Sequence, residues 1–109
     1  MAALADDEAM AALEARAGAV TRILKLMANE KRMLILCRLA GAGEMRVAAL
    51  ADCVSLSQSA LSQHLARMRK AGLVAFRREG QTLYYSIADA QTKRLLLRLK
   101  DIYCPESAL

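Results

Sequence analysis

The chain has 109 residues, of which 56% are hydrophobic and 25% are charged, a composition typical of one globular domain and too apolar for a disordered chain. No apolar run approaches the roughly 20 residues that a membrane-spanning helix requires, and the acidic start lacks the basic segment of a signal peptide. We therefore expect a cytoplasmic protein without a membrane partner.

The net charge of +5 is unevenly distributed along the chain. Residues 1–15 carry four acidic side chains and no basic one, so their formal charge is −4 and that of the remainder is +9. We expect residues 1–15 to form a flexible acidic leader and residues 16–109 to form a single domain. A basic body of this kind suits a polyanionic partner such as a nucleic acid.

The first two predicted helices span residues 8–27 and 29–39. Asn29 is a common N-cap residue and marks the start of the second helix. This second helix is apolar on nearly every side, so it should be central and buried. Its apolar residues are Met33, Leu34, Ile35, Leu36 and Leu39.

The remaining elements follow from turn and cap residues. Gly72 stands where a left-handed cap would end a helix, Glu79 and Gly80 form the turn of a hairpin, and Asp89 can cap a last helix that Pro105 stops. The predicted order is ααααββα, mainly α with a small β-hairpin. These later elements are helices over residues 46–53, 57–70 and 89–103 and strands over residues 73–78 and 82–87.

Two helices joined by a tight turn and followed by a hairpin form a winged helix-turn-helix. In the helix over residues 57–70, Leu61, Leu65 and Met68 should face the core, and short polar side chains occupy the opposite side. Hydroxyls, an amide and a terminal cation suit a helix that lies in the major groove of double-stranded DNA. The residues expected to contact DNA from this helix are Ser57, Gln58, Ser59, Ser62, Gln63, His64, Arg67 and Lys70.

The predicted hairpin adds two cations near its tip, Arg77 and Arg78. We expect them to bind phosphates or to probe the minor groove. A merely soluble helix face would be the simpler explanation of the polar residues. It accounts poorly for the charge, because no Asp or Glu occurs between residues 53 and 78 while five basic residues do.

The segment LSQSALSQHLARMRKAGLVAFRREGQTLYYSI resembles the core signature of the ArsR/SmtB family of bacterial winged-helix repressors, and the likeness extends from Val20 to Cys104. The resemblance implies a homodimer, paired through its first and last helices, that leaves its operator when an inducer arrives. Two recognition helices would then lie about 34 Å apart on an inverted repeat.

Many members of this family sense metals, but their ligand positions are not matched here. Zinc needs three or four N, S or O ligands, and the chain has one histidine, His64, which fits packing or a phosphate contact better than a metal. We therefore expect no metal site and no cofactor, although thiols from two subunits could hold Cu(I) or arsenite. The mismatched positions are Arg46, Ala48, Ala51, Gln91, Ile102 and Pro105.

Three widely spaced cysteines, Cys37, Cys53 and Cys104, include no C-x-x-C pair. Cys37, in the segment RMLILC, is either a small core residue or a reactive thiol. Cys37 and Cys104, the latter in IYC, resemble the matching cysteines of the persulfide-responsive branch of the family, of the SqrR/BigR type. That resemblance implies a disulfide or polysulfide bridge between them. Cys53 adjoins Asp52, which discourages its ionisation, and we expect it to be a bystander.

The reach of such a bridge depends on its length. A direct disulfide requires Cα atoms about 4.4–6.8 Å apart, and each inserted sulfur adds at most about 2 Å. Thiols held slightly too far apart would therefore be bridged more readily by reactive sulfur species than by peroxide. The bridge would fasten the last helix to the second one, and a coupling of about 1–3 kcal/mol would release most operators.

Two other classes of function compete with this interpretation. A thiol enzyme would need an activated thiol, a base and an oxyanion site, which one histidine and five scattered glycines do not supply. A metal(loid)-responsive or constitutive DNA-binding regulator would share the fold and lack the sulfur response. We expect a regulator and not an enzyme.

Overall fold

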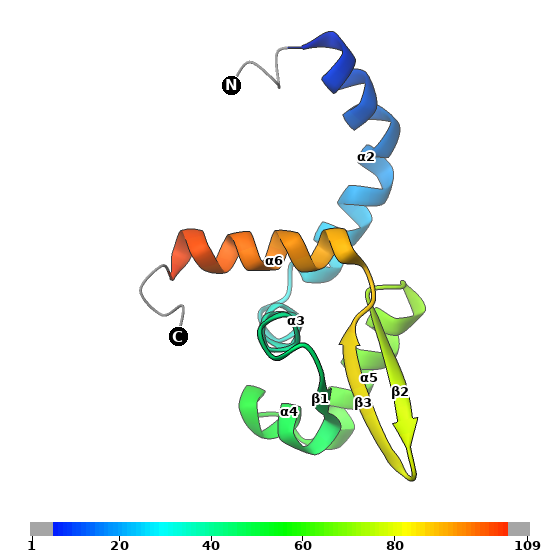
Figure 1. The fold of residues 1–109 in the computed structure, drawn as a ribbon, viewed down its shortest axis with the longest axis vertical. Helices are drawn as coiled ribbons and strands as arrows, with labels where there is room; N and C mark the ends of the chain where they lie inside the picture. The colour runs from blue at the N-terminus through cyan, green and yellow to red at the C-terminus, as the bar shows by residue number, and fades with distance from the viewer. Residues whose placement is uncertain (1–5, 105–109) are drawn as a thin grey trace.

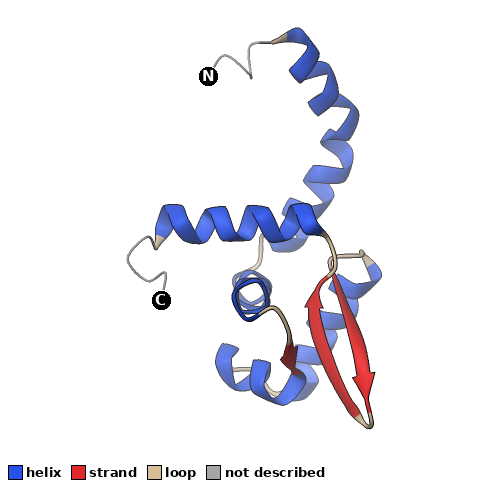
Figure 2. Cartoon of the chain, in the orientation of Figure 1, coloured by secondary structure: helices blue, strands red, loops and turns tan. Residues whose placement is uncertain are grey.

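The computed structural model describes residues 6–104, which form five helices and one three-stranded antiparallel sheet (Figures 1 and 2). The predicted mainly α chain with a β-hairpin is confirmed: α4 and α5 form the helix-turn-helix, and β2 and β3 form the wing. None of the described helices is long and apolar enough to span a bilayer. In chain order the elements are α2 (Asp7–Met27), α3 (Glu30–Ala42), β1 (Met45–Arg46), α4 (Val47–Val54), α5 (Gln58–Lys70), β2 (Val74–Glu79), β3 (Thr82–Ile87) and α6 (Ala90–Tyr103).

The caps predicted at Asn29, Gly72 and Asp89 are present, and Ser57 adds a cap that was not predicted. The side chains of Asn29 and Ser57 each accept a hydrogen bond from the backbone N–H three residues later, at 3.0 Å in both cases, and Asp89 accepts one from Thr92. Gly72 follows α5 with a φ of +82°, a conformation that side chains with a Cβ rarely adopt. These caps satisfy backbone groups that the helix ends would otherwise leave unpaired.

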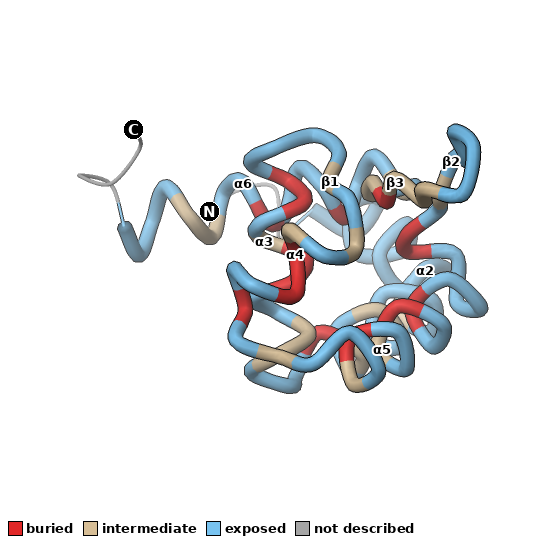
Figure 3. The backbone as a smooth tube through the Cα atoms, turned by 90° about the horizontal axis from the view of Figure 1, so that it is seen from below, coloured by how far each residue is buried: buried red, intermediate tan, exposed pale blue. Residues whose placement is uncertain are grey.

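The core lies where α3 meets α4, α5 and the base of the wing (Figure 3). Leu61, Leu65 and Met68 are fully buried, as predicted. The expectation that α3 is buried on every side is wrong for Met33 and Leu34, which are 38% and 43% exposed. These two side chains line an open pocket between α3 and the last part of α6, so the neighbouring helix does not cover them.

One strand and several boundaries differ from the sequence prediction. The two-residue strand β1 was not expected, because two residues show no alternating pattern; Met45 pairs with Tyr85 and joins the sheet in the order β1-β3-β2. Glu79 pairs with Thr82, so the wing turn is one residue later than predicted, and Gly80 takes the positive φ of +63°. Helix α3 also continues to Ala42, three residues beyond its predicted end.

The acidic leader is helical from Asp7 onwards. Asp6 caps α2 by accepting the N–H of Glu8 at 2.9 Å, and the helix extends away from the body of the molecule (Figure 1). Met27, at the far end, is its one buried residue. Residues 1–5 and the predicted stop at Pro105 lie outside the described residues.

The cap at the start of α6 yields a stability prediction. The Asp89 carboxylate accepts from both the backbone N–H and the hydroxyl of Thr92, whose side chain is 2% exposed. Asp89→Ala removes the acceptor and leaves a buried hydroxyl unpaired, so the free energy of unfolding should fall by about 1–3 kcal/mol in urea titrations. Asp89→Asn keeps an acceptor and should lose less. Equal stability of Asp89→Ala and the wild type would contradict this account.

Candidate nucleic-acid interface and cysteine pocket

One side of α5 is polar, exposed and free of acidic residues. It lies opposite the buried Leu61, Leu65 and Met68, because side chains three or four residues apart share a helix face. The hydroxyl oxygen of Ser57 accepts a hydrogen bond from the backbone N–H of Ala60, and its hydroxyl proton can still be donated to another group. The predicted contact residues that are exposed on or beside this face are Ser57, Gln58, Ser59, Ser62, Gln63, Arg67 and Lys70.

His64, the remaining predicted contact of α5, is half-buried. It lines a notch of about 140 Å³ together with Gln63, Arg67 and Arg32 of α3. Burial lowers the pKa of His64, and the nearby charges of Arg32 and Arg67 lower it further. Arg32 was not among the predicted site residues, because it is 32 residues away from His64 in the sequence.

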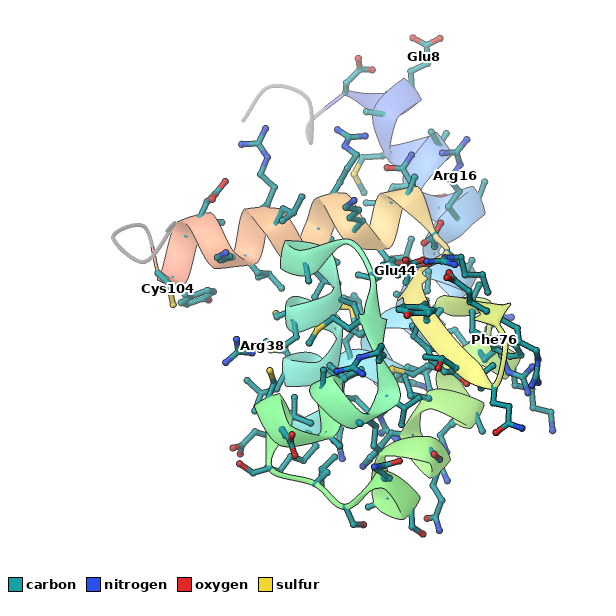
Figure 4. The ribbon with its side chains drawn as sticks, turned by 60° about the horizontal axis from the view of Figure 1, so that its bottom comes forward. Glu8, Arg16, Arg38, Glu44, Phe76 and Cys104 are labelled. Carbon is teal, nitrogen blue, oxygen red and sulfur yellow. The ribbon has the colours of Figure 1, made fainter. Side chains whose placement is uncertain are left out.

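The wing carries an ion cluster around Arg77. Its Nε and Nη2 donate to the two carboxylate oxygens of Glu44 at 2.8 and 2.9 Å, and its Nη1 donates to Glu79 at 2.6 Å. The guanidinium also lies 4.4 Å from the ring centre of Tyr84. This arrangement raises the pKa of Arg77, and the hydrogen bonds from Arg77 lower the pKa of Glu44. Figure 4 places Glu44 against the wing strands.

Arg77 and Arg78, predicted as equivalent, therefore differ. Arg77 fixes the wing to the segment that follows α3, and two carboxylates compensate its charge. Arg78 is exposed and makes no ion pair within residues 6–104. On the inner side of the wing, Arg69 of α5 lies 5.1 Å from the ring centre of Phe76, which holds β2 against the helix.

A second pocket, of about 510 Å³, lies between α3 and the last turns of α6. Both predicted sensor thiols line it: Cys37 is half-buried, and Cys104 is exposed at the end of α6 (Figure 4). Burial raises the pKa of the Cys37 thiol, Lys100 lowers it, and the nearby Cys104 raises it. The complete lining is Met33, Leu34, Cys37, Arg38, Leu99, Lys100, Tyr103 and Cys104.

The third cysteine and the metal-ligand positions lie elsewhere. Cys53 is exposed on α4 and does not line this pocket. In the described part of the chain, no three His, Cys, Asp or Glu side chains lie close enough to hold a metal ion.

Comparison with known proteins identifies the family. The family model described as "Bacterial regulatory protein, arsR family" matches residues 29–75. The HTH-type transcriptional regulator YgaV of Escherichia coli is 42% identical over 96 residues, which cover 88% of this chain and 97% of YgaV. The chain belongs to the arsR family. The predicted resemblance is confirmed at that level.

Solved arsR-family structures share the fold as well as the sequence. The transcriptional repressor BigR from Xylella fastidiosa is 30% identical with a TM-score of 0.80 and covers 87% of this chain and 96% of its own. Reduced HlyU from Vibrio cholerae is 42% identical with a TM-score of 0.79 and covers 84% and 96%. This arsR-family chain is therefore a winged-helix DNA-binding transcriptional regulator and not an enzyme.

The two wing arginines should respond differently to the same substitution. Arg78→Ala removes an uncompensated cation and should flatten the plot of log affinity for DNA against log salt by about 0.9 per lost phosphate contact. Arg77→Ala should change this slope less, because its carboxylate partners already compensate its charge. It should instead accelerate hydrogen exchange of the wing amides. Fluorescence anisotropy and exchange mass spectrometry measure both effects, and the reverse pattern would contradict the assignment.

Proposed function

We propose that this protein is a homodimeric repressor that binds an inverted-repeat operator and releases it when a persulfide or polysulfide links Cys37 to Cys104. The observation that carries the proposal is the single pocket lined by both thiols, at the contact between α3 and α6. The pocket also holds two cations, Arg38 and Lys100, which attract anionic sulfur species.

The exposed face of α5 supports the DNA-reading part of the proposal. Ser59 and Gln63 can form hydrogen bonds with base edges in the major groove. Lys70, at the end of the helix, and Arg78, on the wing, are placed to bind phosphates on either side of the groove.

The surface of α2 and α6 supports the homodimer. Eight large apolar side chains on these two helices are exposed in the single chain, with Ile102 and Tyr103 at 68% and 78%. A second copy would cover them, which favours association through the removal of apolar area from water. Proteins of this family are typically dimeric. The other six side chains are Met10, Leu13, Val20, Leu24, Leu95 and Leu97.

The exposure of the two thiols indicates the order of the sulfur chemistry. The Cys104 thiolate attacks the terminal sulfur of a persulfide R–S–SH, which forms Cys104–S–SH and releases the thiol R–SH. A second transfer extends it to Cys104–S–S–SH and releases another R–SH. The Cys37 thiolate then attacks the middle sulfur, a trisulfide links the two residues, and HS⁻ leaves. The thiol pair is oxidised by two electrons, and the departing sulfur is reduced to sulfide.

The bridge acts on DNA binding through α3. Helix α3 packs against both α6 and α4, and α4 packs against the reading helix α5. Fixing the end of α6 to α3 changes the orientation of α6, through which the two subunits pair. The spacing of the two reading helices then no longer matches two successive turns of the groove.

Two relatives favour a thiol response over a constitutive regulator. BigR, whose fold is similar, is a transcriptional repressor, and one structure of the relative HlyU is that of its reduced form. A metal(loid)-responsive regulator is the alternative, and the experiments below distinguish it because they use metal-free protein in the presence of a chelator.

Substitutions on α5 should separate the two kinds of DNA contact. With a duplex selected from a random pool by the wild-type protein, Lys70→Ala should weaken binding of every sequence and reduce the salt slope by about 0.9 per lost contact. Gln63→Ala should leave the slope unchanged and relax the preference at particular bases by about 1–3 kcal/mol. If both variants behave like the wild type, the face has been assigned wrongly.

The thiol pair should be required jointly for release. Treatment of the reduced protein with an organic persulfide should link Cys37 to Cys104, with mass gains in steps of one sulfur, and should dissociate the DNA complex until a reductant is added. Cys37→Ser and Cys104→Ser should both bind DNA and fail to release it, because a bridge needs two sulfurs.

Cys53→Ser is the matched control and should release DNA like the wild type. The proposed order adds a further result: Cys37→Ser should accumulate a persulfide on Cys104, whereas Cys104→Ser should react more slowly at the half-buried Cys37. Release of the operator by Cys37→Ser under persulfide would show that Cys37 is a core residue and that the bridge is not the switch.

A further inference from the structure

We propose that Arg32, His64 and Arg67 form a binding site for one phosphodiester of the DNA backbone, beside the reading face of α5. This inference deepens the proposed function and rests on its placement of α5 in the major groove. It adds a residue from a helix outside the helix-turn-helix, Arg32 of α3.

The position of the notch follows from the helical spacing of α5. At about 100° per residue, Ala60, His64 and Arg67 lie on one flank of the helix, between the buried stripe and the exposed polar face. Arg69 lies on the opposite flank, where it stacks on Phe76 of the wing. A helix in the major groove has a phosphate backbone along each flank. The wing therefore faces one backbone, and the notch faces the other.

The geometry of Arg32 prepares it for an anion. Its Nε donates to the backbone carbonyl of Leu26 at 2.7 Å, which orients the guanidinium while leaving both terminal NH₂ groups as donors. A planar, oriented pair of donors matches two oxygens of a phosphate. Neither Arg32 nor Arg67 forms an ion pair among residues 6–104. Arg77, with its two carboxylates, shows the contrasting arrangement.

The guanidinium groups of Arg32 and Arg67 both line the notch, and neither is paired with a carboxylate among residues 6–104. Arg32 comes from α3, Arg67 lies on the same helix as His64, and both lower the pKa of His64, after the larger effect of burial. A phosphodiester placed between them would reverse this effect, because it compensates both cations and accepts a hydrogen bond from the protonated imidazole. His64 should thus take up a proton as DNA binds.

The proton uptake has a defined sign. The pKa of His64 is low in the unbound protein and higher in the complex, so affinity increases as the pH falls through the interval between the two values. Within that interval, one pH unit should change affinity by up to about tenfold per histidine. His64→Gln should lose this dependence.

The test measures DNA affinity by fluorescence anisotropy with a duplex selected by the wild-type protein, between 50 and 200 mM salt and between pH 6 and 8. Arg67→Gln and Arg32→Gln should each weaken DNA binding by about tenfold, equally for all sequences. Each should also reduce the slope of log affinity against log salt by up to about 0.9 per notch. Arg16→Gln, the same charge change at an exposed position of α2 that lines neither the notch nor the thiol pocket, is the matched control and should leave the slope unchanged.

The outcomes separate this inference from the proposed function. Arg32→Gln loses the hydrogen bond to the Leu26 carbonyl and could unfold at a lower temperature than the wild type. In that case Arg67→Gln is the deciding variant, since the Arg67 side chain makes no such hydrogen bond among residues 6–104. Slopes equal to that of Arg16→Gln would overturn the notch while leaving release by persulfide intact. Competition by millimolar inorganic phosphate would also overturn it, because the notch would then be a site for a free anion. If the slopes of Arg32→Gln and Arg67→Gln change as expected but the wild-type protein keeps its DNA under persulfide, the proposed function is contradicted and the notch is not.

Discussion

The burial of α3 is the constraint on which the rest of the structure depends. Ile35, Leu36 and Leu39 are fully buried, and the helix packs against α2, α4, α6 and β3. Helix α5 makes its main contacts with α4 and β2, whereas α6 makes its own with α3 and β3. The surface proposed to face DNA and the helix that carries Cys104 are therefore held in a fixed relation by one apolar helix between them.

Features that depend on local sequence were predicted well. The caps at Asn29 and Asp89, the left-handed Gly72 and the buried stripe of α5 all follow from residues within one or two helical turns. Strand β1 was missed, because its pairing with β3 is decided by tertiary contact and not by a pattern in two residues. Met33 and Leu34 were misassigned because an apolar side chain does not indicate whether a neighbouring helix covers it.

The candidate site residues also divide into those that a local pattern indicates and those that only the fold brings together. The polar face of α5 and the pair of cysteines were found from the sequence, since each is visible as a pattern or as a resemblance. The partners of Arg77 and Arg32 were not found. Glu44 is 33 residues away from Arg77, and the carbonyl of Leu26 carries no side-chain signal. The charge of an arginine is a property of the sequence, but its availability to a ligand is decided by what folds against it.

The position of Cys104 has a mechanical consequence. Helix α6 is anchored at its start by Asp89 and Thr92 and near its middle by the buried Leu96, while Cys104 lies at the opposite end. Fourteen residues at 1.5 Å each make a rigid arm of about 20 Å. Displacement on rotation about the start of α6 is greatest at its end, where Cys104 lies. A rotation of about 10° at the start therefore corresponds to a displacement of about 3.5 Å at the Cys104 sulfur. The proposed bridge would thereby convert a bond change of a few ångströms into a turn of the whole arm.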